Sequence, residues 1–460
     1  MLESVVHSIL SKADDKPFIT VSSVFYRDPG STYPVAVRAD GMYIFDDKDR
    51  RYLDMSGGAA VSSVGHGHPD VVRAVQEQAA KLAFAHTSFF TNEPQEELAA
   101  RLAARFAEPD AKVWFTSGGS ESNESALKIA WQYWRAAGQP EKTIIISRQF
   151  SYHGGTLGAT SISGSVFRRT PYEKVLHNWP RIAPCYPYRH QQEFETEREY
   201  GHRVAAELDE AIRLAGAENV AAFVAEPVVG ATLGVVPAVP GYFQEIRRIC
   251  DEHDVLFIAD EVMCGSGRCG TFYAHEADGV LPDMVTIAKG VGGGYQPIGA
   301  VIARDMICDA IRNDKAAFAH GHTYIGHAIS CAAGVAIQKC LDDGLLEGVA
   351  GKGQRMMAIL EERFGEHPNV GDIRGRGLFI GIEFVLDRKA KTAFPVEDNI
   401  PGRLKRAAMQ QQIICYPGGG TVDGRAGAHL LLAPPYIAEE EHFQDCADRL
   451  ENVFAQVFGS

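Results

Sequence analysis

A single lysine stands at the end of an apolar segment, where a buried strand would deliver it into a site. Lys289 follows the run MVTIA (284–288) and precedes the small residues GVGGG. Neutral, desolvating surroundings lower the pKa of a lysine amine and favour its reaction with a carbonyl group to form an imine. A random surface lysine would not normally end an apolar strand. Lys289 is therefore the first candidate for covalent catalysis.

Two acidic residues, Asp260 and Glu261, end another apolar run, VLFIA (255–259). A carboxylate at the end of a buried strand needs a cationic or hydrogen-bonding partner, because desolvating an unpaired charge is too costly. A protonated ring nitrogen would be such a partner for Asp260. Glu261 can equally be read as an acid exposed in the following loop.

Small and aromatic residues at two further strand ends could hold an anion and a planar ring. In FTSGGSESNESALK (115–128) a strand passes through a Ser/Gly turn into a helix, so Gly119 and Ser120 could form a phosphate cup at the helix N-terminus. The alternative is a plain N-cap. Tyr152, before His153 and a glycine pair, offers a face on which a heterocycle could stack, although packing alone would also explain it.

Two other patterns do not point to binding sites. The segment GSGRCG (265–270) matches the dinucleotide pattern GxGxxG, but TFYAHEADG follows it instead of an amphipathic helix. The histidine pairs His66/His68 and His320/His322 lie in glycine-rich loops without nearby cysteine or carboxylate ligands. We therefore expect neither a nucleotide at this loop nor a bound metal.

Alternating strand and helix patterns must position these residues. Short buried strands are expected at 143–147, 221–225, 255–259, 284–288 and 299–303, and helices at 69–83, 93–107, 120–135 and 241–253, with a hairpin at 41–56 and a strand-like element at 375–385. Strands that are apolar on both faces predict an α/β fold with a mostly parallel sheet covered by helices. Ligands then bind at the carboxyl ends of the strands, where all four candidate segments lie.

Size and composition restrict the class of protein. With 460 residues, the chain is long enough for a large domain and a smaller companion. A net charge of -14 argues against a nucleic-acid partner, which needs a basic face. Nine scattered cysteines without a CxxC pair favour a reducing compartment. Because neither an export signal nor an uninterrupted apolar span is evident, we expect a soluble, cytoplasmic protein that does not enter a membrane.

The ordered set of motifs resembles the class III (omega) aminotransferases, which are fold type I pyridoxal-phosphate enzymes. The resemblance covers nearly the whole chain and rests on YLDMSGG, GHGHP, FTSGGSESNESALK, YHG, EPVVG, DEVMCGSGR, AKGVGGGYQPIGAV, GHTY and LAPPY. It implies an N-terminal segment that forms part of a small domain (1–60), a large cofactor-binding domain (61–325) and a C-terminal small α/β domain (326–460). The implied cofactor is pyridoxal 5'-phosphate.

The resemblance also implies roles for individual residues around the cofactor. Lys289 would hold it as a Schiff base and shuttle the proton, and Asp260 would keep its ring nitrogen protonated. The other residues that would contact the cofactor are Tyr152 and Val262 on the ring faces, Gly119 and Ser120 at the phosphate, and Glu226 near the ring. Thr323, in GHTY, would reach the phosphate of a neighbouring subunit, which implies a homodimer, with a tetramer of two dimers as the alternative.

Departures within the motifs bear on the substrate. Met263 after DEV makes the chain resemble the branch that uses pyruvate with beta-alanine or other amines. Ala59 and Ala60 stand where several such members have a bulky tryptophan, which implies a roomier pocket. Phe89 and Ala231 match pocket-lining positions, and Arg425 resembles a mobile arginine that pairs with a substrate carboxylate; the alternative is a surface arginine in a glycine-rich loop.

The expected reaction is a ping-pong transfer of an amino group from an amine or omega-amino acid to a keto acid, with pyruvate as the expected acceptor. An isomerase, racemase or decarboxylase is the alternative, because the same fold and Lys/Asp pair also serve those reactions. A cofactor-binding protein without catalysis is a third hypothesis, which the intact Lys289 and Asp260 disfavour.

Overall fold

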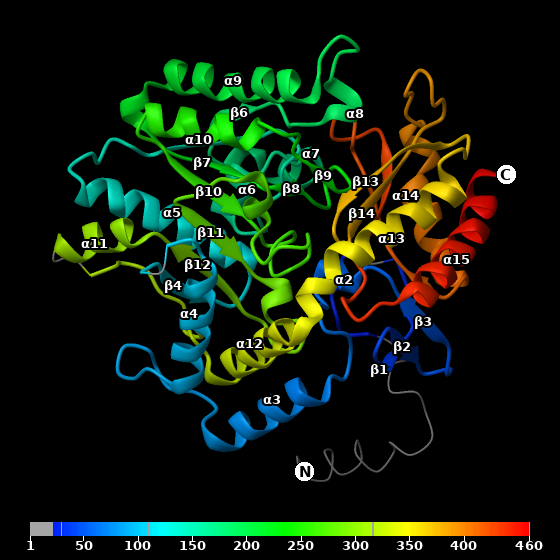
Figure 1. Cartoon of the computed structure of the whole chain (residues 1–460), viewed down its shortest axis with the longest axis horizontal. Coiled ribbons are helices and arrows are strands. Elements are labelled where there is room, and N and C mark those ends of the chain that lie inside the picture. The colour runs from blue at the N-terminus through cyan, green and yellow to red at the C-terminus, as the bar shows by residue number, and fades with distance from the viewer. Residues whose placement is uncertain (1–21, 29, 109, 315–316, 460) are drawn as a thin grey trace, which may run out of the picture.

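The computed structural model describes residues 22–28, 30–108, 110–314 and 317–459 (Figure 1). The first 21 residues, on which the expected lack of an export signal depends, lie outside the described residues.

A seven-stranded sheet forms the centre of the larger part of the molecule. Its strand order is β4-β12-β11-β10-β7-β5-β6. The strands are β4 (Lys112–Thr116), β5 (Ile144–Arg148), β6 (Arg181–Ile182), β7 (Val220–Ala225), β10 (Leu256–Asp260), β11 (Met284–Ile287) and β12 (Gly299–Ala303). The five predicted strand positions are confirmed to within a residue or two. The mostly parallel α/β fold is also confirmed, with one exception: β12 runs antiparallel to both of its neighbours.

Helices cover both faces of this sheet, and the strand residues alternate between two apolar clusters. Phe257 packs in a cluster with helices α9 (Glu197–Ala215) and α10 (Tyr242–Glu252). Its neighbour Ile258 packs in a second cluster with α5 (Gly119–Ala136). Two covered faces explain why these strands are apolar along their whole length. Their carboxyl ends are therefore where polar side chains can gather.

The predicted helices and hairpin are present. The remaining larger helices are α3 (Pro69–Lys81), α4 (Glu93–Arg105), α11 (Asp305–Asn313), α12 (Ala328–Cys340), α13 (Leu346–Phe364), α14 (Ile400–Gln410) and α15 (Glu440–Phe458). The shorter ones are α2 (Gly57–Ala60), α6 (Leu157–Ile162), α7 (Val166–Arg169) and α8 (Pro187–His190). The hairpin consists of β2 (Tyr43–Asp46) and β3 (Arg51–Asp54), which pair antiparallel across the polar turn.

Two small sheets occupy the other side of the molecule, on the right in Figure 1. The hairpin forms one with β1 (Ala36–Asp40) and with β15 (Ile413–Ile414), which pairs parallel with β3. The second contains β13 (Val370–Arg376), β14 (Phe379–Phe384), β17 (Ala428–Leu432) and β16 (Tyr416–Gly419). The single strand expected at 375–385 is thus the end of β13, a turn, and β14. Gly377 makes this turn possible because its φ of 58° suits glycine.

Helix α2 lies between the two sides, as Figure 1 shows, and its Ala60 packs with Val228, Phe379 and Leu431. A minor two-stranded sheet, β8 (Val228–Val229) with β9 (Val236–Pro237), borders the same cluster.

No helix in the described part of the chain is long and apolar enough to cross a membrane. All nine cysteines lie among the described residues and are free thiols.

Candidate active site

Lys289 lies immediately beyond strand β11, in a backbone conformation that side chains rarely adopt. Its φ is 52°, in the left-handed region, which costs a non-glycine residue about 1 kcal/mol or more. Its half-buried amine donates a hydrogen bond of 3.0 Å to the carbonyl oxygen of Ala59 in α2. Burial lowers the pKa of the Lys289 amine to about 8, with Asp260 opposing this effect and Arg168 adding to it. A larger fraction of this amine is therefore uncharged near neutral pH than for an ordinary lysine.

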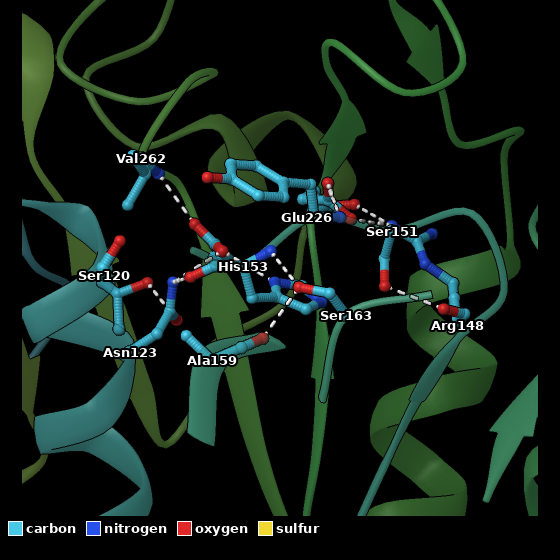
Figure 2. A network of polar contacts seen from close by, with 12 residues as sticks. Ser120, Asn123, Arg148, Ser151, His153, Ala159, Ser163, Glu226 and Val262 are labelled. Atoms are coloured by element: carbon cyan, nitrogen blue, oxygen red, sulfur yellow. Dashed lines mark hydrogen bonds and ion pairs between the residues drawn. The ribbon is translucent and has the colours of Figure 1, made fainter. Parts of the chain in front are cut away.

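Asp260 ends the neighbouring strand β10 and is held by donors on both oxygens. Asn123 donates to its Oδ2 at 2.8 Å, and Nδ1 of His153 lies 2.7 Å from the same oxygen. The backbone N–H of Val262 donates to Oδ1 at 3.0 Å. Figure 2 shows these groups converging on one carboxylate from α5, from the loop after β5 and from the loop after β10. A carboxylate with this many donors is fixed in position and orientation.

Asn123 and His153 are the site residues that the sequence interpretation did not assign. Both are buried, and Asn123 also accepts a hydrogen bond of 3.1 Å from Thr286 of β11. Spacing could have suggested them, because Asn123 lies one helical turn beyond Ser120 and His153 directly follows Tyr152. The Nε2 atom of His153 is buried without a partner among the described residues.

The N-terminus of α5 forms a narrow cup beside these residues. Its N-cap, Gly118, provides no side-chain cap, so the N–H groups of the first turn remain available to a ligand. A Cβ atom on Gly119 would lie 2.6 Å from the side chain of Val262, so only glycine fits there. The Ser120 hydroxyl accepts a 3.0 Å hydrogen bond from the N–H of Gly155, which fixes the loop after β5 against the cup.

Tyr152 and Glu226 form the next wall of the site. The N–H of Tyr152 donates to Oε1 of Glu226 at 3.2 Å (Figure 2). Burial raises the pKa of the Glu226 carboxyl, although Arg148, 3.5 Å from its Oε2, favours the charged form. The guanidinium of Arg168 lies 4.3 Å from the centre of the Tyr152 ring.

The five other residues assigned from the sequence occupy different surroundings. Ala231 and Arg425 line one cavity of about 1040 Å³, which also contacts Arg168. Ala60 is buried in α2, next to the Ala59 carbonyl that receives the lysine amine. Phe89 is 80% exposed, and Thr323 is exposed in a turn next to a second hollow formed partly by residues 86–88. Within one chain, therefore, Ala231 and Arg425 are brought together, whereas Phe89 and Thr323 face outward.

The structure also describes the surroundings of the glycine-rich loop and of the histidine pairs. Residues 265–270 form turns that lead into a short 3-10 helix (Ala274–Asp278), with no amphipathic helix after the glycines. The described residues contain no cluster of three or more His, Cys, Asp or Glu side chains that could hold a metal ion.

The geometry is that of an amine beside a fixed carboxylate, with an anion cup and an aromatic wall. The sequence pattern of the family described as "Aminotransferase class-III" matches residues 26–454. The chain belongs to the class III aminotransferases. It is a transaminase that depends on pyridoxal 5'-phosphate and moves an amino group between an amine and a keto acid.

Relatives of known sequence and structure agree with this assignment. An uncharacterized aminotransferase of Schizosaccharomyces pombe is 41% identical over 98% of this chain and 97% of its own length. A solved (S)-enantioselective omega-transaminase from Thermomicrobium roseum has a TM-score of 0.87 at 34% identity, with 99% of this chain and 98% of that chain covered. An omega transaminase from Pseudomonas jessenii, solved in complex with PMP, has a TM-score of 0.85 at 30% identity and covers 93% of both chains.

The residues present in this aminotransferase fit the cofactor. The uncapped first turn of α5 supplies N–H groups for a phosphate, and Asp260 retains lone pairs for a further donor. The backbone of Gly154 has a φ of 137°, and a Cβ atom there would lie 2.7 Å from the Ser120 hydroxyl. At Gly154 the loop after β5 therefore lies so close to the cup that only a residue without a side chain fits there.

The lowered pKa of Lys289 predicts how this aminotransferase takes up its cofactor. Only the uncharged amine attacks a carbonyl group, so the rate of covalent uptake of added pyridoxal phosphate by the cofactor-free protein should rise with pH and level off above about 8. The visible absorption of the bound cofactor, followed between about pH 6 and pH 10, gives this rate. A rate that keeps rising toward the pKa of an ordinary lysine would contradict the prediction, and Lys289→Ala should show no covalent uptake.

Proposed function

We propose that the chain transfers amino groups from an amine or omega-amino acid to pyruvate by a ping-pong mechanism, with Lys289 and Asp260 as its central catalytic pair. The observation that supports this most is their position at the ends of adjacent strands β11 and β10, one as an amine of lowered pKa and the other as a carboxylate held by three donors.

In this proposal, residues of the site contact the phosphate of the cofactor, its ring nitrogen and both faces of its ring. The first turn of α5, with Gly119 and Ser120, binds the phosphate through N–H groups and the positive end of the helix dipole. Tyr152 and Val262 contact the two faces of the ring. Asp260 pairs with the ring nitrogen, while Glu226 is a supporting polar group because it positions the backbone of Tyr152.

Each catalytic group has a defined task. When bound, pyridoxal phosphate supplies an electron sink that stabilises negative charge on the substrate carbon. Lys289 is the group that removes and returns the substrate proton, because its amine is uncharged in part at neutral pH. The Ala59 carbonyl, which accepts the amine's hydrogen bond, orients Nζ. Asp260 keeps a negative charge fixed opposite the ring nitrogen, and Asn123 and His153 prevent it from rotating away.

Arg425 is proposed to bind the carboxylate of the keto acid. It lies in the turn between β16 and β17, where Asp423 Oδ1 accepts hydrogen bonds from the N–H groups of Arg425 and Ala426 at 2.8 and 2.7 Å. The backbone is thereby fixed, while the exposed guanidinium has no hydrogen bond or ion pair within the described chain. Such an arginine can turn toward the cavity for a carboxylate and away from it for an uncharged amine.

Replacing Arg425 by alanine should therefore raise the apparent KM for pyruvate by about 10- to 100-fold, the loss of one charge-assisted hydrogen bond. The KM for an uncharged amine should change by less than about twofold. Steady-state kinetics with each substrate varied in turn give both values, and the exposed Arg312→Ala serves as the matched control. Equal changes in the two constants would exclude Arg425 from this task.

The visible spectrum of the holoenzyme tests the proposed reaction. We expect an amine from a panel of donors to remove the cofactor's visible band and pyruvate to restore it. Restoration by 2-oxoglutarate alone would contradict pyruvate as the acceptor. Consumption of a single substrate without any change in the band would instead favour an isomerase or decarboxylase.

A homodimer with shared active sites is also proposed, with a tetramer of two such dimers as the alternative. Apolar side chains stay exposed in one chain at Phe84, Phe89, Phe90 and Tyr324, near the outward-facing Thr323. Such a group of exposed aromatic residues favours burial against a second subunit. Thr323 would then reach the phosphate in the partner's site, and Phe89 would line the partner's pocket.

We further propose the domain limits 1–60, 61–325 and 326–460, since β1 to β3 pair with β15 and not with the seven-stranded sheet. A cytoplasmic location is proposed from the free thiols.

A further inference from the structure

The cavity that contains Ala231 and Arg425 has an unusual balance of charge. Its volume is about 1040 Å³, and three stretches line most of it: 165–171, 394–401 and 416–428. Two of its lining residues, Arg168 and Arg425, carry a positive charge. None of the described lining residues is an aspartate or a glutamate. Anything bound in this cavity therefore lies in a positive field with apolar walls, which strengthens its interaction with an anion.

The local structure fixes the place of Arg168. It belongs to the short helix α7, whose last residue, Arg169, is buried. Arg169 donates hydrogen bonds of 2.8 to 3.2 Å to three carbonyl oxygens, those of Thr160, Ser161 and Ser163. These bonds attach α7 to the C-terminal end of helix α6 through one arginine. The adjacent Arg168 contacts the cavity, with its guanidinium 4.3 Å from the centre of the Tyr152 ring.

Arg168 lacks an anionic partner. Its half-buried side chain makes no hydrogen bond or ion pair with the described residues, and its guanidinium contacts the Tyr152 ring instead. The aromatic face offsets only part of the cost of removing a guanidinium from water. The nearby Arg169, in contrast, has both carbonyl partners and Glu173. A cation left without a partner at the wall of a substrate cavity is suited to an anion that arrives with the substrate.

Arg168 also acts on the reacting amine through its charge. That charge contributes to the lowered pKa of Lys289, and the guanidinium contacts the ring of Tyr152. The Arg425 loop touches the same wall, because a Cβ atom on Gly424 would lie 2.3 Å from the side chain of Val166 in α7. The two cations therefore belong to adjoining segments of one cavity. This arrangement gives the cavity two separate positions for acidic groups.

We propose that Arg168 is a second anion-binding residue, which selects amino donors with an acidic group at the end remote from the reacting amine. This inference rests on the proposed function, and it names the donor class as omega-amino acids and related amino-acid anions in preference to uncharged alkylamines. Arg425 binds the carboxylate of the keto acid, as proposed above, in the second half of the reaction. A dicarboxylic substrate would engage both arginines at once.

Donors that differ only in the remote group test this selection. The holoenzyme is mixed with 5-aminopentanoate, pentylamine or 1,5-diaminopentane, and the loss of the cofactor's visible band gives a rate and an apparent Kd without any acceptor. We expect 5-aminopentanoate to react at least about tenfold more efficiently than pentylamine, and the diamine to react least well, as one charged contact predicts. Equal efficiency for the three donors would overturn the proposal. Failure of every amine to change the band would instead contradict the proposed function itself.

Variants then assign the preference to Arg168. Arg168→Met should reduce the efficiency with 5-aminopentanoate at least about tenfold more than the efficiency with pentylamine, mainly through the apparent Kd. Arg168→Lys, which keeps the charge, should restore part of the preference. Lys174→Met removes an exposed positive charge close by in the chain and should leave the preference unchanged. If Arg168→Met slowed all donors equally, Arg168 would only support the Tyr152 ring, and the proposal would be wrong.

A second readout does not depend on turnover. Pentanoate, which has the acidic group but no amine, should raise the Tm of the wild-type holoenzyme and compete with 5-aminopentanoate. Arg168→Met should lose most of this Tm shift while keeping its own Tm without ligand close to that of the wild type. An equal shift in both proteins would show that pentanoate binds elsewhere and would contradict the assignment.

Discussion

We expect Lys289→Ala to lower the rate of transamination by about 10⁴-fold, the upper end of the range for loss of a proton-transfer group. The alanine variant lacks both the amine that joins the cofactor and the base that moves the substrate proton. The fold should survive, because a half-buried amine with one hydrogen bond, to Ala59, is removed and no cavity forms in the apolar core. Initial rates with a reactive donor, together with the Tm, check both statements.

Two further measurements would distinguish the loss of a catalytic group from the loss of folded structure in this variant. Exposed Lys48→Ala, which changes a lysine of the hairpin turn, should retain the wild-type rate. Added small alkylamines should restore part of the activity of Lys289→Ala, because they can supply the missing base in the vacated space. Retention of more than about one per cent of the wild-type rate without added amine would show that another group moves the proton.

Asp260→Asn is expected to lower kcat by about 10²- to 10³-fold, the usual effect of removing a preorganised electrostatic partner. The amide has no negative charge to hold a proton on the ring nitrogen. Its NH₂ group would also face Asn123 or His153, which now approach the Oδ2 atom within 2.8 Å. We therefore expect weaker cofactor binding and an altered visible spectrum as well as slower turnover. Spectral titration with pyridoxal phosphate measures the first two effects independently of activity.

His153→Gln provides a graded comparison with Asp260→Asn. It leaves the Asp260 charge in place and removes one of its partners, so a loss of about tenfold is expected, in keeping with one charge-assisted hydrogen bond. Similar losses in the two variants would mean that positioning matters as much as charge. An Asp260→Asn variant with unchanged spectrum and kcat would remove Asp260 from the proposed pair.

The fold could be predicted well where a pattern is local. Apolar runs of about five residues located five strands of the central sheet, and the polar turn DDKDR located the hairpin. Both features depend mainly on residues that are adjacent in the sequence. The prediction was less accurate at 375–385, where one apolar stretch contains the end of β13, a turn at Gly377 and β14. Buried apolar residues follow that turn at once, from Leu378 onward, and hide it in the residue pattern.

The antiparallel direction of β12 could not be predicted in the same way. Its residues GAVIA are as apolar as those of the parallel strands of the same sheet. Strand direction depends on the path of the connection from Lys289 to Ile298, which turns back beside β11 without a crossover helix. The pattern of apolar residues indicates which strands are buried. The direction of a strand depends instead on the path of the chain that connects it to its neighbours.

The sequence by itself indicated the family and the cofactor through the resemblance of its ordered motifs. It also located the residues that end the central strands, because a lysine or carboxylate at the end of a buried run is too costly to keep without a partner. Tertiary structure alone decided which groups meet. The Ala59 carbonyl reaches Lys289 across 230 residues, and His153 reaches Asp260 across 107. Only the structure revealed that Arg168 faces a cavity without an anionic partner among the described residues. Periodicity encodes which face of an element is buried, but the packing of distant elements selects the partner that each side chain finds there.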